Sequence, residues 1–336
     1  LVGVNTKFGN NADQDNKRPY ISGGAYMNTG KIGKKAVINV INAANETKIS
    51  AIYAGDYWTD RDMDVDINLD GNLIDTTIYT GGIYGNLKGN VNVNLSSKSN
   101  VDKFNKTNHE GNINLTLKEK FFSTSLDLEN VNNLTMEENT RITLPEDSSF
   151  NIDNVKLSNE SIIDFRSMKN SIEVKGNFIG VDKVSEDKKG AAILLNNKQT
   201  LNINGNVTGI TRLNNSGQEY VAPLEDGHEY IKASYNSTGS FRIIDKNTNY
   251  NIKEKVEGKT KIWYAVRDRK ELERVQWIND KDERIVNPGN NTDYGFEIEF
   301  IDDEGKYISA LEIQEKLTLT VEKEDGTIIN QENADE

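Results

Sequence analysis

Apolar and polar residues alternate along many short stretches of this chain, which is the pattern of β-strands with one buried face. Three such stretches lie at residues 36–41, 63–69 and 91–95, and a tyrosine followed by a loop rich in glycine and polar residues precedes each of them. These tyrosines, Tyr26, Tyr53 and Tyr79, are 27 and then 26 residues apart. A repeat of this length predicts successive coils of one repeating structure.

Aligning the coils on the tyrosines predicts which side chains stack on one another. The expected inward columns are Ile38, Val65 and Val91, and beside them Val40, Ile67 and Val93. The expected outward polar column is Asn39, Asp66 and Asn92. The next strand adds Ile113, Leu115 and Leu117 to the inside. The alignment therefore predicts apolar ladders inside the stack and amide and acid ladders outside it.

From about residue 126 to 210 the alternations become shorter and recur every seven to ten residues, separated by Asn, Ser, Asp and Glu. This density favours an all-β chain folded as a single-stranded parallel β-helix, or β-solenoid, for which we expect the right-handed form. An antiparallel β-sandwich is the alternative for this spacing. The solenoid is preferred because a sandwich gives no reason for side-chain columns to persist through a 26- to 27-residue repeat.

The composition changes after about residue 250, where asparagine becomes rare and charged residues increase. We predict a β-solenoid over residues 1–262 and, over residues 263–336, a small C-terminal module that is β-sandwich-like or acts as a cap or stalk. Within that module we expect a short helix at 268–276 and a hairpin at 316–329 with its turn at Asp325 and Gly326.

The stretch DINLDGNLIDTT, residues 66–77, matches the first half of an EF-hand calcium loop but has Thr77 where the bidentate glutamate should stand. Two interpretations remain open. The acids Asp62, Asp64, Asp66 and Asp70 are either an outward polar row of one coil or a calcium site, which would make calcium the only cofactor.

Tyr57 and Trp58 lie in the loop of the same coil, and Tyr84 lies in the loop of the next. Large aromatic side chains in a polar loop stack on sugar rings or anchor a protein partner. The alternative is that one ring simply packs over the neighbouring coil beside Tyr84. These three residues are the predicted ligand-binding residues.

Composition and motifs exclude several other functions. The net charge is -13 and no basic patch is present, which argues against nucleic acid as a partner, and no apolar run is long enough for membrane insertion. The chain has no cysteine, and its two histidines, His109 and His228, show no metal-binding spacing and are expected at the surface. No catalytic residues are predicted.

The coil GGIYGNLKGNVNVNL, the asparagine-rich solenoid and the segment FEIEFIDDEGKYI resemble the pectate-lyase-like adhesive regions of Gram-positive cell-wall surface proteins. The resemblance covers roughly residues 20–260. It implies a secreted or wall-attached extracellular protein that binds a host-surface or matrix protein or glycan without catalysis. The alternatives are a β-helix polysaccharide lyase or hydrolase, for which Arg61 beside Asp60 and Asp62 is a candidate base, and a structural spacer.

Overall fold

A computed structural model describes residues 20–22, 35–41, 47–49, 51–56, 58–70, 73–96, 99–183, 190–214, 224–243, 250–267, 272–277, 298–302, 307–308, 318–322 and 328–333. Every regular element in these ranges is a β-strand. Consequently no helix in the described ranges is long and apolar enough to cross a membrane.

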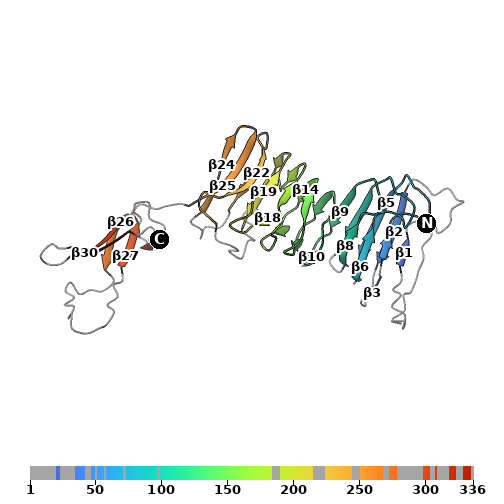
Figure 1. The fold of residues 1–336 in the computed structure, drawn as a ribbon, viewed down its shortest axis with the longest axis horizontal. Coiled ribbons are helices and arrows are strands. Elements are labelled where there is room, and N and C mark those ends of the chain that lie inside the picture. The colour runs from blue at the N-terminus through green and yellow to red at the C-terminus, as the bar shows by residue number, and fades with distance from the viewer. Residues whose placement is uncertain are drawn as a thin grey trace. The chain divides into compact units, whose positions relative to one another are not determined.

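The longest sheet, here called the spine sheet, takes one parallel strand from each coil (Figure 1). Its strands lie in chain order: β2 (Lys35–Ile41), β5 (Asp64–Asp70), β7 (Val91–Leu95), β9 (Ile113–Leu117), β11 (Asn133–Met136), β14 (Asn154–Leu157), β17 (Phe178–Ile179) and β20 (Val207–Thr208). Each step from one strand to the next is one turn of the chain, so the stack has about seven turns. The predicted parallel β-solenoid is confirmed, and the sandwich alternative is wrong.

Three further sheets form the other faces of the coils. The N-terminal sheet contains β1 (Tyr20–Ser22), β4 (Ala51–Tyr53), β6 (Leu73–Tyr79) and β3 (Thr47–Lys48), with β8 (Ser99–Asn105) also paired to β6. The second sheet is β10 (Phe122–Ser123), β12 (Arg141–Thr143), β15 (Ile162–Asp164), β18 (Ala191–Leu194), β21 (Ile210–Leu213) and β23 (Ser240–Arg242). The third sheet is β13 (Phe150–Ile152), β16 (Ile172–Val174), β19 (Leu201–Ile203), β22 (Glu229–Ser234), β25 (Thr260–Arg267) and β24 (Tyr250–Glu257).

Stacked apolar side chains form the core. One inward column passes through all eight spine strands as Ile38, Ile67, Val93, Leu115, Leu134, Val155, Phe178 and Val207, and every member is buried. Val65 lies opposite Val91, as predicted. The predicted register of the first strand is wrong by two residues, because Ile38 pairs with Ile67 and Ala36 pairs with Val65. A shift of two keeps every side chain on its own face, so alternation alone does not detect it.

Contacts divide the chain into two compact units, the first comprising residues 1–246 and 252–265 and the second residues 247–251 and 266–336. In the second unit, β26 (Leu272–Trp277), β27 (Ile298–Asp302) and β28 (Tyr307–Ile308) form an antiparallel sheet. The short helix expected at 268–276 is therefore wrong, because β26 occupies most of that stretch. The expected hairpin is confirmed as β29 (Thr318–Glu322) and β30 (Ile328–Asn333), with its predicted turn outside the described residues.

The first prediction concerns the inner column. We expect Ile67→Ala to lower the free energy of unfolding by about 2–5 kcal/mol, because Ile67 is fully buried and the lost methyl groups leave a cavity between neighbouring coils. The matched control is Val37→Ala on the exposed face of β2, which should change stability by less than about 0.5 kcal/mol. Urea unfolding followed by far-ultraviolet circular dichroism measures both, and equal effects would contradict the column.

Candidate functional site

Three consecutive loops stack at one corner of the solenoid, between the N-terminal sheet and the spine sheet. This loop stack comprises residues 54–63, 80–90 and 106–112, of which Tyr57 lies outside the described residues. Arg61, Leu87 and His109 form parallel bridges with one another across the three loops. Backbone N–H groups also donate from loop to loop, from Arg61 to the Asn86 carbonyl at 2.7 Å and from Leu87 to the Asn108 carbonyl at 2.8 Å. The loops are thus held in register like the strands.

Glycine makes this close stacking sterically feasible. A Cβ atom added to Gly82 would lie 2.0 Å from the Asp56 carbonyl oxygen, and one added to Gly85 would lie 2.3 Å from the Thr59 carbonyl oxygen. Both distances are far below van der Waals contact, so only glycine permits the backbones to approach this closely. The loop stack is therefore a tightly packed platform.

Trp58 and Tyr84 stand on the outside of this platform. Their rings stack with centroids 4.3 Å apart and planes 14° apart. Trp58 is 54% exposed and Tyr84 is 59% exposed. The two predicted ligand-binding residues that the structure describes are thus brought together on adjacent coils, and we call them the aromatic pair.

A buried ion pair lies within the same loops. Arg61 Nε donates to Asp56 Oδ2 at 2.5 Å, and the Asp56 side chain is fully buried. The Arg61 side chain is only 13% exposed. Its guanidinium group therefore has a structural partner five residues away, rather than standing free beside Asp60 and Asp62 as a candidate base.

His109 is buried in the loop stack at 9% exposure, so its expected surface position is wrong. Its Nε2 is 2.8 Å from the Gly89 carbonyl oxygen and its Nδ1 is 3.1 Å from Thr80 Oγ1. Since a carbonyl only accepts, Nε2 carries the proton and Nδ1 of the neutral ring accepts from the Thr80 hydroxyl. Burial lowers the pKa of His109 below its usual value, and nearby Lys106 lowers it further against the raising effect of the Gly89 hydrogen bond. Aligning the loops would have placed His109 beside buried Leu87 and so revealed its position.

The acidic row of β5 faces outward as predicted, since Met63, Val65, Ile67 and Leu69 are buried between its members. Each carboxylate within the strand already accepts a hydrogen bond from the next coil. Asp64 accepts from the Asn90 N–H at 2.8 Å, Asp66 from Asn92 Nδ2 at 2.9 Å and Asp70 from Ser96 Oγ at 2.8 Å. Asp62 is exposed just before the strand. No group of three or more acidic or histidine side chains in the described ranges is arranged to hold a metal ion, and calcium binding stays a prediction.

Asp66 begins a ladder of asparagines on the outer face of the spine sheet. Asn92 Nδ2 donates to Asp66, Asn114 to Asn92 Oδ1 at 2.8 Å, Asn133 to Asn114 Oδ1 at 2.7 Å and Asn154 to Asn133 Oδ1 at 2.8 Å. All the amides point the same way, which polarises and strengthens such a chain. Lys35 Nζ lies 2.7 Å from the other Asp66 oxygen, and this contact raises the pKa of Lys35. The carboxylate of Asp66, with which the ladder begins, is thus already paired with the Lys35 ammonium group.

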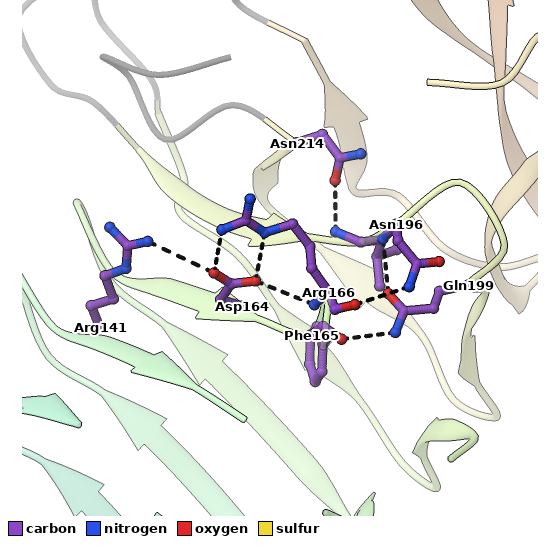
Figure 2. A network of polar contacts seen from close by, with 8 residues as sticks. Arg141, Asp164, Phe165, Arg166, Asn196, Gln199 and Asn214 are labelled. Atoms are coloured by element: carbon purple, nitrogen blue, oxygen red, sulfur yellow. Dashed lines mark hydrogen bonds and ion pairs between the residues drawn. The ribbon is translucent and has the colours of Figure 1, made fainter. Parts of the chain in front are cut away.

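A second polar network fastens coils on the second sheet (Figure 2). Arg166 Nε and Nη2 approach the two oxygens of buried Asp164 at 2.8 and 2.7 Å, and Arg141 Nη2 lies 3.7 Å from the same carboxylate. Beside it, Asn196 Nδ2 donates to the Arg166 carbonyl at 3.0 Å and Gln199 Nε2 to the Phe165 carbonyl at 2.7 Å. This carboxylate is fully engaged in holding two arginines, so its role is structural.

Comparison with protein-family models, with curated proteins and with solved structures finds no match for this chain.

The second prediction tests the amide ladder. Asn114→Ala removes two hydrogen bonds between coils and should lower the free energy of unfolding by about 1–3 kcal/mol, since each such bond contributes about 0.5–1.5 kcal/mol. Thr116→Ala, in the next outward position of the same strand, is the matched control and should have a smaller effect. The measurement is urea unfolding, and a control as destabilised as Asn114→Ala would argue against the ladder.

The third prediction concerns acidification. Because the pKa of His109 is lower in the folded than in the unfolded chain, the unfolded chain binds more protons near the ordinary histidine value of 6.5. The neutral His109 ring contributes fully to the free energy of unfolding above pH 6.5, and this contribution is lost as the pH falls through the pKa of His109 in the folded chain. We therefore expect the urea midpoint of the wild-type protein to fall between pH 7.5 and 5.5, and that of His109→Gln to fall less. His228→Gln is the control for losing the other histidine, and its urea midpoint should fall as much as that of the wild-type protein. If the fall is reduced in His228→Gln as much as in His109→Gln, or more, the assignment to His109 is contradicted.

Proposed function

We propose that this chain is an adhesive surface protein, secreted or attached to a Gram-positive cell wall, that binds a host-surface or matrix protein or glycan without catalysing a reaction. The observation that supports this proposal is the aromatic pair, in which two large rings on adjacent coils remain more than half exposed. Tryptophan and tyrosine are the side chains that most often anchor protein partners, and both stack readily on sugars.

The loop stack under the aromatic pair supports the same proposal. Close glycine contacts, the Asp56–Arg61 ion pair and the buried His109 hold the loops in one arrangement. A platform that is ordered before binding loses little conformational entropy when a ligand arrives, which favours affinity. The aromatic pair is therefore a preformed contact surface.

The fourth prediction is that Trp58→Ala and Tyr84→Ala each weaken binding to the ligand found on a glycan array or a matrix-protein panel by about tenfold or more, because each removes a ring of a size that typically contributes more than 1 kcal/mol. Phe122→Ala is the matched control, since Phe122 is 60% exposed on β10, outside the loop stack. It should bind like the wild-type protein.

Two results would contradict this function. Unchanged binding by both aromatic variants would remove the aromatic pair from the contact surface. Release of unsaturated products from acidic polysaccharides in the presence of calcium would instead identify a lyase.

A further inference from the structure

The third sheet ends in a strand with one open edge. Its last two strands, β25 and β24, form a hairpin, and both are drawn in orange at the C-terminal end of the solenoid in Figure 1. β24 is the last strand in the order of that sheet, and no strand in the described ranges pairs with it on the side away from β25. A strand in this position presents backbone N–H and C=O groups to an incoming strand.

The hairpin turn indicates which residues of β24 present these groups. Glu257 ends β24 and Thr260 begins β25, so the turn between them has two residues and starts with a glycine of φ 61°. The residues that flank such a turn are paired with each other, and successive residues of a strand direct their backbone groups to opposite sides. The N–H and C=O groups of Val256 and Glu254 therefore point toward the open edge.

β24 is accessible to solvent along its whole length. None of its eight residues is buried, and Val256 is 59% exposed. A second large apolar side chain is exposed beside the hairpin turn, where Tyr235 is 51% exposed and its N–H donates to the Lys259 carbonyl at 3.1 Å. Another molecule can thus reach both the edge and the apolar side chains next to it.

The two faces of β24 differ in chemistry. Ile252 and Glu254 line a cavity of about 640 Å³, and alternation places Val256 on the same face, which is therefore largely apolar. The opposite face carries two lysines. Lys255 is held between two glutamates at 2.8 Å each. Lys253 is exposed and, within the described ranges, forms no ion pair. An unneutralised positive charge thus lies opposite the apolar face.

A second copy of the chain does not fit this edge. Two identical antiparallel strands are related by a two-fold axis perpendicular to their sheet, so the residue on the axis lies directly opposite its own copy. The two registers with the longest overlap of β24 are centred on Lys253 and on Glu254. Either two lysines or two glutamates then meet, and like charges directly opposite each other are destabilising. The same charges favour a different strand that carries acidic residues.

We propose that the open edge of β24 binds an extended segment of another protein, in which acidic and apolar residues alternate, and that this segment adds a strand to the third sheet. Its apolar side chains lie against Ile252 and Val256. Its acidic side chains lie opposite Lys253. Addition of a strand to a sheet edge is a general mode of peptide recognition, in which the backbone provides affinity and the side chains provide specificity. This site is separate from the aromatic pair and does not depend on it.

The binding test uses peptides selected on the full chain. A phage-displayed library of random nonapeptides is depleted on the Lys253→Glu variant and then panned against the wild-type chain, and the tightest binder is resynthesised with a fluorescent label. Fluorescence anisotropy compares this peptide with two forms that are N-methylated at odd or at even positions. A strand pairs through one edge only, so one methylated form should bind at least tenfold more weakly and the other within about threefold of the unmodified peptide. Equal binding of the two methylated forms overturns strand addition.

Variants of the chain locate the site. Glu254→Pro removes an N–H from the open edge, a position at which an edge strand tolerates proline, and should weaken binding at least tenfold with an unchanged circular dichroism spectrum. Lys253→Glu should also weaken binding at least tenfold, because it places a carboxylate opposite the acidic residues of the peptide. The matched control, Lys156→Glu, reverses an exposed charge on β14 and should bind normally. Trp58→Ala should also bind normally, which separates this site from the proposed adhesive surface.

Three results overturn the proposal. The first is a library that yields no peptide sensitive to Lys253→Glu. The second is a set of sensitive peptides without acidic residues. The third is a dimer of the wild-type chain in sedimentation velocity that Glu254→Pro dissociates, which would identify a second copy as the occupant. The methylated peptides and Lys253→Glu keep the test decisive even where Glu254→Pro disturbs the hairpin.

Discussion

The structure depends on stacking one coil on the next in register. A coil of short strands has no core of its own, because its few inward side chains are covered only when the coils before and after place similar side chains above and below them. The column that includes Ile67, Val93 and Leu115 meets this requirement through the whole spine sheet. Backbone hydrogen bonds also run from coil to coil, parallel to the side-chain columns. The same alignment of the coils therefore provides both the core packing and the hydrogen bonds, and losing that alignment loses both.

The same constraint explains the use of asparagine on the outer face. An asparagine side chain both donates and accepts, so identical amides can follow one another in a column without limit, as Asn92, Asn114 and Asn133 do. Aspartate only accepts, and two aspartates in successive coils would repel each other. Asp66 therefore stands at the end of its ladder, with Lys35 beside it. The acidic run that resembles a calcium loop is, in this structure, the coil in which several ladders begin.

Most of the solenoid could be predicted because its physical rule is periodic and therefore visible in the sequence. The errors lie where periodicity carries no information. Ala36 and Ile38 both fit the inward face of the first strand, so alternation does not distinguish two registers that differ by two residues. Leu272 and Val275 are three residues apart, a spacing that suggests a helix, but the pairing of β26 with β27 determines the strand. The burial of His109 does not follow from strand alternation, because His109 lies in a loop, where no alternating pattern marks the inward positions.

Stacking in register also brings aromatic rings together, and this has a consequence for function. Tyr53 and Tyr79 stack at 4.6 Å on paired strands and are partly buried, so ring stacking by itself is an ordinary result of the fold. Trp58 and Tyr84 stack just as closely but keep more than half of their surface in contact with water. Stability alone would favour covering that surface, since each exposed ring forgoes hydrophobic stabilisation. The difference in exposure between two otherwise similar pairs is therefore what favours a binding role for the outer pair.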